Sequence, residues 1–121
     1  MSLPFPLGVD ILEWKKAGGF YREHRSRLDA LLHPQELMFV KRSRKPAQAF
    51  AKVFSAKEAV FKALGASWMG VSGFKEVEIF PKKDFAFRLK GALRKKHTRK
   101  GPMKISFKEN HRCIVALCAG T

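Results

Sequence analysis

The stretch PAQAFAKVFSAKEAVFKALG, residues 46–65, has the strongest regular pattern in this 121-residue chain. At about 100° of rotation per residue, its apolar side chains fall on one arc of a helix and mostly small residues fall opposite. The apolar arc holds Phe50, Val53, Phe54, Val60, Phe61 and Leu64, and the opposite face holds Lys52, Ala56, Ala59 and Ala63. Such a helix can pack closely on two sides, so we expect it at the centre of the fold. Gly65 stands where a helix commonly ends.

The segments before this helix predict one strand and two helices. Residues 6–12 are apolar except for Asp10, which predicts a short buried strand carrying one carboxylate. A helix is expected over residues 14–32, and the pair His33 and Pro34 should end it. A shorter helix follows over residues 35–40, with Pro34 as its first residue. A basic segment then leads to Pro46, another favourable helix start.

After the glycine at position 65 the apolar pattern changes to a period of two. Two antiparallel strands are expected at residues 76–79 and 85–90, joined by a turn over residues 81–84. Further strands are expected at residues 104–107 and 112–118, and the last should be central because it is apolar on both faces. Helices followed by strands indicate an α+β fold, and the length indicates one domain over residues 1–121.

The charge of the chain is its most unusual bulk property. Lys and Arg number 25 against 10 Asp and Glu, which gives a net charge of +15 and a pI near 10.4. Such a field favours nucleic acid, anionic lipid, phosphorylated small molecules or acidic proteins as partners. The N-terminus lacks the pattern of a secretory signal, and the longest apolar run, residues 113–119, is too short to span a bilayer. We therefore expect a cytoplasmic protein without a membrane partner.

Cysteine and histidine indicate no metal cluster. Cys113 and Cys118 lie five residues apart in one predicted strand, so their side chains should point to opposite faces and cannot bridge each other. The chain has no CxxC pair and its His residues are scattered, which argues against zinc. Reduced, packed thiols are expected.

Three residues could instead form a magnesium and phosphate site. Asp10 needs a compensating partner in its apolar strand, and Glu58 and Lys62 are four apart, hence neighbours on one helix face. Two carboxylates suit Mg²⁺ bound together with phosphates, and a nearby Lys can neutralise phosphate or act as a base. Each residue also has an ordinary explanation, as a capping acid or as a surface ion pair. Lys57 lies inside the apolar arc and must reach water or meet an anion.

These residues match a known family. The segment GVDI, residues 8–11, and the segment FSAKEAVFKALG, residues 54–65, resemble the two signature motifs of the 4′-phosphopantetheinyl transferase superfamily. Length and spacing resemble the short bacterial holo-acyl-carrier-protein synthase type. HPQEL at residues 33–37 and GVSGFKEVEIF at residues 70–80 are also similar to family segments, so the resemblance covers nearly the whole chain.

The resemblance implies a fold, a reaction and a set of site residues. The fold is an antiparallel sheet packed against a long central helix. The reaction is the Mg²⁺-dependent transfer of 4′-phosphopantetheine from coenzyme A to a serine of an apo acyl carrier protein, with release of adenosine 3′,5′-bisphosphate. Asp10 and Glu58 match the metal-binding acids, and Lys62 matches the lysine that contacts phosphate or deprotonates the serine. Lys45 and Gly65 fall where the family contacts coenzyme A.

Further implications concern assembly and partners. Short members resemble homotrimers with active sites between subunits, acting in fatty acid biosynthesis and lipid metabolism. The first helix of the family docks an acidic carrier protein, and here it carries five basic residues: Lys15, Lys16, Arg22, Arg25 and Arg27. Longer members often have a third acid two residues after the first. This chain has Leu12 at that position, which favours the short type.

Two departures from the family pattern leave alternatives open. Phe107 stands where a His is usual, and Val53 stands where an Arg is common, although Lys52 is adjacent. These departures keep open a catalytically weakened homologue that binds carrier protein or coenzyme A. A basic nucleic-acid-binding module would suit the pI, but the chain shows no RNP-like strand, zinc pattern or helix-turn-helix spacing. We rank the active transferase first and expect no nucleic-acid partner.

Overall fold

The computed structural model describes residues 5–65, 73–97 and 102–120. The strands are β1 Leu7–Glu13, β2 Val77–Phe80, β3 Ala86–Leu89, β4 Met103–Glu109 and β5 Cys113–Gly120. The helices are α1 Trp14–His24, α2 Leu28–Leu31, α3 Pro34–Arg42, α4 Pro46–Ala63 and α6 Gly91–Lys96. Two short 3₁₀ turns, η1 Arg25–Arg27 and η2 Pro81–Lys83, complete the described elements.

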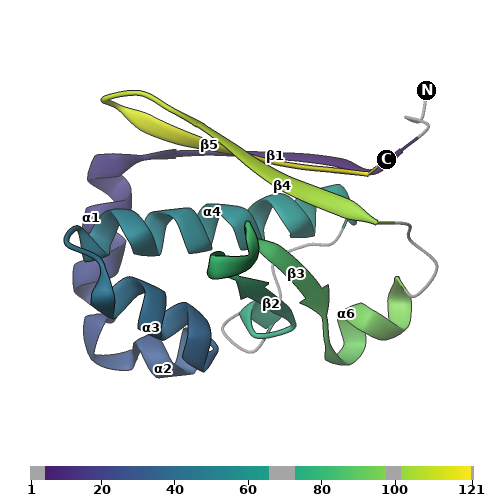
Figure 1. Cartoon of the computed structure of the whole chain (residues 1–121), viewed down its shortest axis with the longest axis horizontal. Coiled ribbons are helices and arrows are strands. Elements are labelled where there is room, and N and C mark those ends of the chain that lie inside the picture. Colours follow the sequence, from purple (N-terminus) through teal and green to yellow (C-terminus); the bar gives the residue numbers. More distant parts are fainter. Residues whose placement is uncertain (1–4, 66–72, 98–101, 121) are drawn as a thin grey trace.

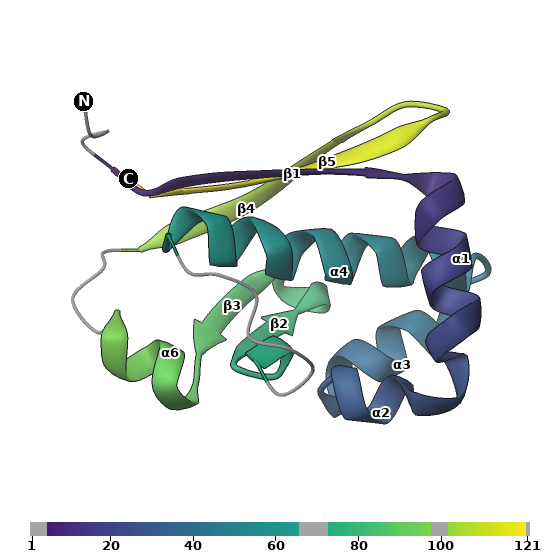
Figure 2. The same ribbon diagram turned by 180° about the vertical axis from the view of Figure 1, so that it is seen from behind.

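The strands form two antiparallel sheets on either side of the long helix. The larger sheet has the order β1-β5-β4, and the hairpin β2-β3 is separate. Figures 1 and 2 show α4 lying along one face of the larger sheet, with α3 and the hairpin on its other side, while α1 runs from the end of β1 across the N-terminal end of α4. The opposite face of that sheet carries no other described element (Figure 1). The α+β class, the central helix and the central position of the last strand are confirmed.

Close packing of β1 on α4 explains why one face of the helix is built from small residues. A Cβ atom on Gly8 would lie 2.1 Å from the backbone oxygen of Ala59 and 2.3 Å from the backbone nitrogen of Ala63. Only glycine fits, because distances below about 3 Å between such atoms are not tolerated. Asp10 lies two residues further and points to the same side of the strand. The close crossing therefore brings this carboxylate onto α4.

The apolar arc of α4 forms the core with α1, α3 and the hairpin. Phe50, Val53 and Val60 are completely buried, as are Phe74, which precedes the hairpin, and Ile79, which belongs to it. Phe54 packs between its neighbours, with ring centroids 5.9 Å from Phe50 and 5.1 Å from Phe74. The structure thus confirms the two-sided role of this helix.

The helix predicted over residues 14–32 is wrong in its continuity. Helix α1 ends at His24, the 3₁₀ turn η1 follows, and α2 begins at Leu28. Only Ala17 of α1 is buried, whereas Leu28 and Leu31 of α2 are both in the core. The break redirects the chain so that these two leucines turn inward. A straight continuation of α1 would not achieve this.

Helix α6 was not predicted, because its first turn is held by a distant residue. The backbone nitrogen of Leu93 donates a hydrogen bond of 2.6 Å to Glu76 Oε1, and the backbone nitrogen of Lys90 bonds the Glu76 carbonyl at 2.7 Å. A carboxylate at a helix start satisfies free backbone donors there.

None of the described helices combines the length and apolar character needed to cross a bilayer.

Candidate active site

Asp10 and Lys62 meet between the first strand and the central helix. Asp10 is 8% exposed on the inner side of β1, and its Oδ1 accepts a hydrogen bond of 3.0 Å from Lys62 Nζ. The Lys62 side chain is 51% exposed. The buried acid therefore has the partner that its apolar strand demanded, and the ammonium group stays open to solvent on one side.

Glu58 lies one helical turn before Lys62, and the charges of Asp10 and Lys62 both act on its pKa. Burial raises the pKa of Glu58, the negative charge of Asp10 raises it further, and the positive charge of Lys62 acts in the opposite direction. These effects place the Glu58 carboxylate within electrostatic range of both Asp10 and Lys62. The structure thus brings together Asp10, Glu58 and Lys62, which the sequence singled out from segments about fifty residues apart.

The donor chemistry of this cluster fits a hard divalent cation. It presents two carboxylates, and the negative charge of Asp10 is one of the causes that raise the pKa of Glu58, after burial. Within the described ranges, no three His, Cys, Asp or Glu side chains gather into a group that could hold a metal alone. One or two carboxylates completed by substrate phosphates and water is the usual way in which proteins bind Mg²⁺.

Gly65 lies beside this cluster and Lys45 does not. Gly65 follows α4 with φ +67°, and its backbone nitrogen bonds the Lys62 carbonyl at 3.1 Å. Lys45 is the N-cap of α4, so at 1.5 Å of rise per residue it stands about 25 Å from Lys62 along the helix axis. Lys45 instead lines a cleft of about 270 Å³ together with Arg44 and Lys52.

Lys57, the residue before Glu58, meets an anion rather than reaching water, the second of the two outcomes expected for it. Its Nζ lies 2.8 Å from Glu36 Oε1, and both side chains are completely buried. The same ammonium group donates to the backbone oxygens of Phe74 at 2.9 Å and Leu31 at 3.4 Å. Burial lowers the pKa of Lys57 and the carboxylate of Glu36 acts in the opposite direction. This ion pair joins α4 to α3 and to the segment that leads into β2.

Glu36 was not singled out from the sequence, although it is central to this contact. Its Oε1 also accepts from the backbone nitrogen of His33, and its Oε2 accepts from that of Ile79, each at 2.7 Å. The signal that could have found it is the capping-box position, three residues after the residue that precedes the helix. Its buried environment depends on β2, which is more than forty residues away in sequence.

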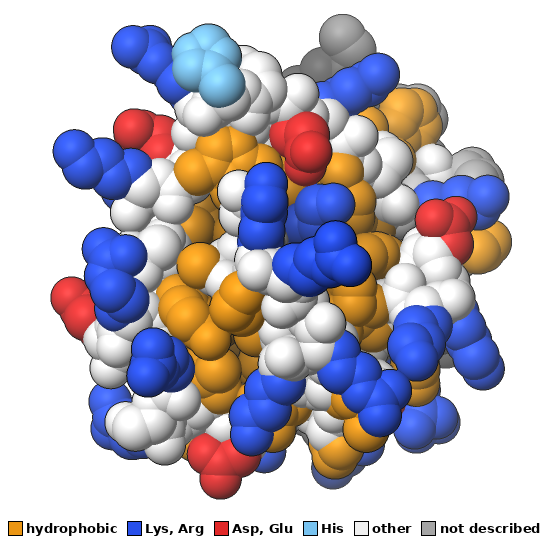
Figure 3. All heavy atoms as spheres, turned by 60° about the vertical axis from the view of Figure 1, so that its left-hand side comes forward, with side chains coloured by type: hydrophobic (Ala, Val, Ile, Leu, Met, Phe, Trp, Pro, Cys, Tyr) orange, Lys and Arg blue, Asp and Glu red, His pale blue; other side chains and the backbone are white. Residues whose placement is uncertain are grey.

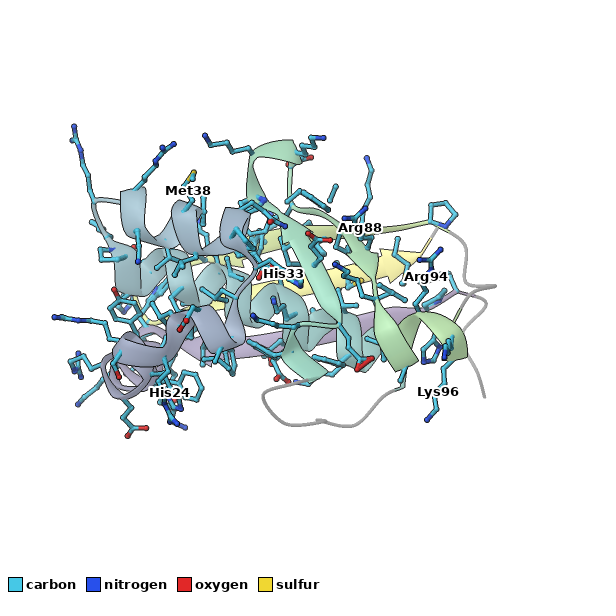
Figure 4. The ribbon with its side chains drawn as sticks, turned by 90° about the horizontal axis from the view of Figure 1, so that it is seen from below. His24, His33, Met38, Arg88, Arg94 and Lys96 are labelled. Atoms are coloured by element: carbon cyan, nitrogen blue, oxygen red, sulfur yellow. The ribbon has the colours of Figure 1, made fainter. Side chains whose placement is uncertain are left out.

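A third buried carboxylate, Glu78, organises the hairpin. It receives hydrogen bonds of 2.6 Å from Arg88 Nε and 2.9 Å from Gln35 Nε2, and His33 Nδ1 lies 4.0 Å away. Burial tends to raise the pKa of Glu78, but these donors outweigh it and lower that pKa below its usual value. Figure 4 shows His33 and Arg88 approaching this region from α3 and β3. In the period-two pattern of residues 76–79, Glu78 alternates with Val77 and Ile79 and would be expected on a polar side of the strand, so its burial does not follow from the pattern.

Phe107 and Val53, the two departures from the family pattern, both pack against other side chains of the fold. Phe107 is half-buried and packs edge-to-face on Phe85 at 4.8 Å between centroids, and Phe85 packs in the same way on Phe39 at 5.6 Å. Phe85 has φ +56°, which is unfavourable for a bulky side chain. Val53 is completely buried, so its position faces the core. Lys52, next to it, lines the same cleft as Lys45.

Comparisons with known proteins support a family assignment. The family model described as the 4′-phosphopantetheinyl transferase superfamily matches residues 6–117. A holo-[acyl-carrier-protein] synthase from Clostridium acetobutylicum is 38% identical over 73 residues, which is 60% of this chain and 58% of that protein. A synthase of the same name from Dechloromonas aromatica is 39% identical over 62 residues, half of each chain. The matched segment thus spans about half the length of these relatives.

Solved structures of similar fold cover nearly the whole chain. The holo-[acyl-carrier-protein] synthase of Neisseria meningitidis has a TM-score of 0.77 and 25% identity, covering 96% of this chain and 97% of that one. The Helicobacter pylori synthase in complex with coenzyme A has a TM-score of 0.75 and 20% identity, covering 95% and 99%. The family model matches well over half of the sequence. The chain therefore belongs to the 4′-phosphopantetheinyl transferase superfamily.

Proposed function

We propose that this protein is a holo-acyl-carrier-protein synthase, which transfers 4′-phosphopantetheine from coenzyme A to a serine of apo acyl carrier protein. The observation that carries the proposal is the hydrogen bond of Lys62 to Asp10 where β1 crosses α4, with Glu58 one helical turn away and under the electrostatic influence of both. The relatives named as this enzyme and the coenzyme A complex of the Helicobacter pylori protein support it. We also propose that it works in the cytoplasm, in fatty acid biosynthesis.

Asp10 and Glu58 would hold the magnesium ion in this proposal. When bound, magnesium neutralises the pyrophosphate of coenzyme A and stabilises the charge that develops on the leaving phosphate. Glu58 must lose its proton to serve, and its raised pKa means that it does so less readily than an ordinary Glu. The hydrogen bond from Lys62 holds the Asp10 carboxylate in place.

Lys62 has two compatible roles, and both use its half-exposed ammonium group. As a cation, it neutralises a phosphate oxygen of coenzyme A; as a neutral amine, it takes the proton of the carrier serine. Gly65, directly after the helix, lets the backbone approach the same substrate without a side chain in the way. Lys62→Arg separates the two roles, because arginine keeps the charge and cannot act as a base.

The first helix is the proposed docking surface for the acidic carrier protein. Lys and Arg side chains spread over the face shown in Figure 3, which includes the side of α1, and few acidic side chains lie among them. Complementary charges of this kind mainly raise the association rate, so added salt should weaken the reaction with the carrier. Added salt should have a smaller effect on the binding of coenzyme A alone.

A homotrimer is the proposed assembly, and the outer side of β1 is its proposed interface. Val9 is 41% exposed and Ile11 is 66% exposed, and Phe5 and Leu7 extend the same apolar row. Exposed apolar patches of this kind are typical of protein interfaces. The separation of Lys45 from Lys62 also supports a site shared between subunits, because one chain presents these residues at opposite ends of α4. Light scattering that shows an active monomer would contradict the trimer.

The activity test weighs the product. The protein is incubated with coenzyme A, Mg²⁺ and several apo carrier proteins, and mass spectrometry should show a gain of one phosphopantetheine group. Asp10→Asn and Glu58→Gln should abolish the transfer, while Asp29→Asn, which removes an exposed acid on α2, should leave it unchanged. Normal transfer by either site variant would refute the assigned metal ligands.

A weakened homologue is the second candidate, and it rests on Phe107. An aromatic ring packed on Phe85 cannot supply the polar contact that a His would offer. This candidate predicts that calorimetry shows binding of coenzyme A. It also predicts that none of the tested carrier proteins gains mass. Phe107→His should then raise transfer. An unchanged or lower rate in that variant would speak against the second candidate.

A further inference from the structure

A second and larger cleft lies between α3 and η2 and includes none of the proposed site residues. Its volume is about 440 Å³, within the range typical of small-molecule sites. The described residues that line it are Gln35, Met38, Phe39, Arg42, Ser43, Phe80, Pro81, Lys82 and Lys83. Neither the reaction proposed above nor the carrier surface on α1 gives this cleft a task.

The walls of the cleft are mainly apolar. Met38 is 46% exposed, and Figure 4 shows its side chain extending outward from α3. Phe39, Phe80 and Pro81 supply the remaining apolar surface. A methionine side chain is unbranched and adaptable, so it can pack along an alkyl chain.

The rim of the cleft carries cations that lack acidic partners. Arg42, Lys82 and Lys83 are all exposed, and no ion pair among the described residues includes any of them. No Asp or Glu belongs to the described lining. Three unpaired positive charges beside an apolar hollow are complementary to a molecule with an apolar body and an anionic end.

The environment of Phe80 favours an aliphatic body over a flat aromatic one. The Lys83 ammonium lies 5.9 Å from the centroid of this ring, and the Arg88 guanidinium lies 5.6 Å from it. Cations over a ring occupy the surface on which a purine would stack. Phe39 is engaged edge-to-face with Phe85. The cleft therefore offers ring edges, a thioether and a proline rather than an open aromatic face.

We propose that the cleft between α3 and η2 binds a medium-chain fatty acid anion. The alkyl chain lies against Met38, Phe39 and Pro81, and the carboxylate faces the cations of Arg42, Lys82 and Lys83. This site is independent of the transferase reaction proposed above. Its test therefore measures binding and does not require that carrier protein be modified.

The probes are sodium butyrate, hexanoate, octanoate and decanoate, titrated into the full chain below micelle-forming concentrations and followed by calorimetry. Each added methylene that enters the cleft should tighten binding about fourfold, until the cleft is full. Added salt should weaken binding of all four probes, because the carboxylate is held by exposed cations. Equal affinity of butyrate and decanoate would overturn the proposal, since charge alone would then explain binding.

Paired variants separate the cleft from the general positive charge of the protein. The double variant Lys82→Gln, Lys83→Gln should weaken decanoate at least tenfold, and Met38→Gln should reduce the gain per methylene. The control is the double variant Lys95→Gln, Lys96→Gln, which removes the same charge from exposed positions on α6. Equal weakening by the control would overturn the assignment to this cleft. Thermal unfolding verifies that all three variants fold.

A competition experiment tests the other ligand class. Adenosine 3′,5′-bisphosphate is titrated in the presence of saturating decanoate, and its affinity should not change if the two occupy different places. Mutual exclusion that disappears in the Lys82→Gln, Lys83→Gln variant would assign the cleft to a nucleotide and overturn the fatty acid proposal. Absence of decanoate binding to the native assembly would overturn it as well.

Discussion

Loss of the buried Lys57 ammonium should destabilise the fold far more than loss of any exposed lysine. Lys57→Met keeps the length of the side chain and removes the charge. The carboxylate of Glu36 then stays completely buried without its counter-ion, and the Phe74 carbonyl loses its hydrogen-bond donor. Removal of one partner from a buried ion pair costs about 3–5 kcal/mol of the free energy of unfolding. We expect a loss near the middle of that range.

This magnitude corresponds to a large change in melting temperature. At about 2.1 cal/mol/K of unfolding entropy per residue, the 121-residue chain has an unfolding entropy of about 0.25 kcal/mol/K. A loss of about 4 kcal/mol therefore lowers the melting temperature by about 16 °C. Urea denaturation followed by circular dichroism measures the free energy directly, and calorimetry gives the melting temperature.

Two further variants test the cause. Glu36→Gln added to Lys57→Met removes the stranded charge, so the double variant should be more stable than Lys57→Met alone by more than about 1 kcal/mol. Lys52→Met is the control on the same helix, because Lys52 is partly exposed and its contact with Glu109 is 3.9 Å long. It should change stability by less than about 0.5 kcal/mol. The reasoning is refuted if Lys57→Met matches this control, or if Glu36→Gln destabilises the Lys57→Met variant further.

Three other predictions concern the strand crossing, the site and a thiol. Gly8→Ala should destabilise the protein by more than about 2 kcal/mol in urea denaturation, because its methyl group meets backbone atoms of α4, whereas Gly19→Ala has open space and should not destabilise. The raised pKa of Glu58 means that its contribution to stability is present at low pH and is lost as pH rises through that pKa. In the metal-free protein, the variant Glu58→Gln should therefore be more stable than the wild type at pH 7 but not at pH 4. An equal effect at both pH values would contradict this. Burial raises the pKa of Cys118 to about 12, so mass spectrometry should show its alkylation at neutral pH only after denaturant is added.

The sequence predicted best what depends on regular periodicity and on residues within one helix. The central helix and the neighbours Glu58 and Lys62 followed from spacing alone, and Asp10 was recognisable as a lone carboxylate in an apolar strand. It predicted less well what depends on distant partners. The break after His24 reflects a core that only the assembled fold defines. Glu36 and Glu76 are ordinary surface acids by composition, and they are buried or engaged only because β2 and α6 pack beside them.

Strand β1 performs two tasks with alternate residues. Gly8 and Asp10 point inward, where the glycine sets the distance to α4 and the acid enters the proposed active site. Val9 and Ile11 point outward into the proposed subunit interface. Since neighbouring residues share one backbone, a displacement that improves subunit contact also moves the acid. Catalysis and assembly in this protein are therefore expected to change together during evolution, and neither face of the strand can be redesigned without regard to the other.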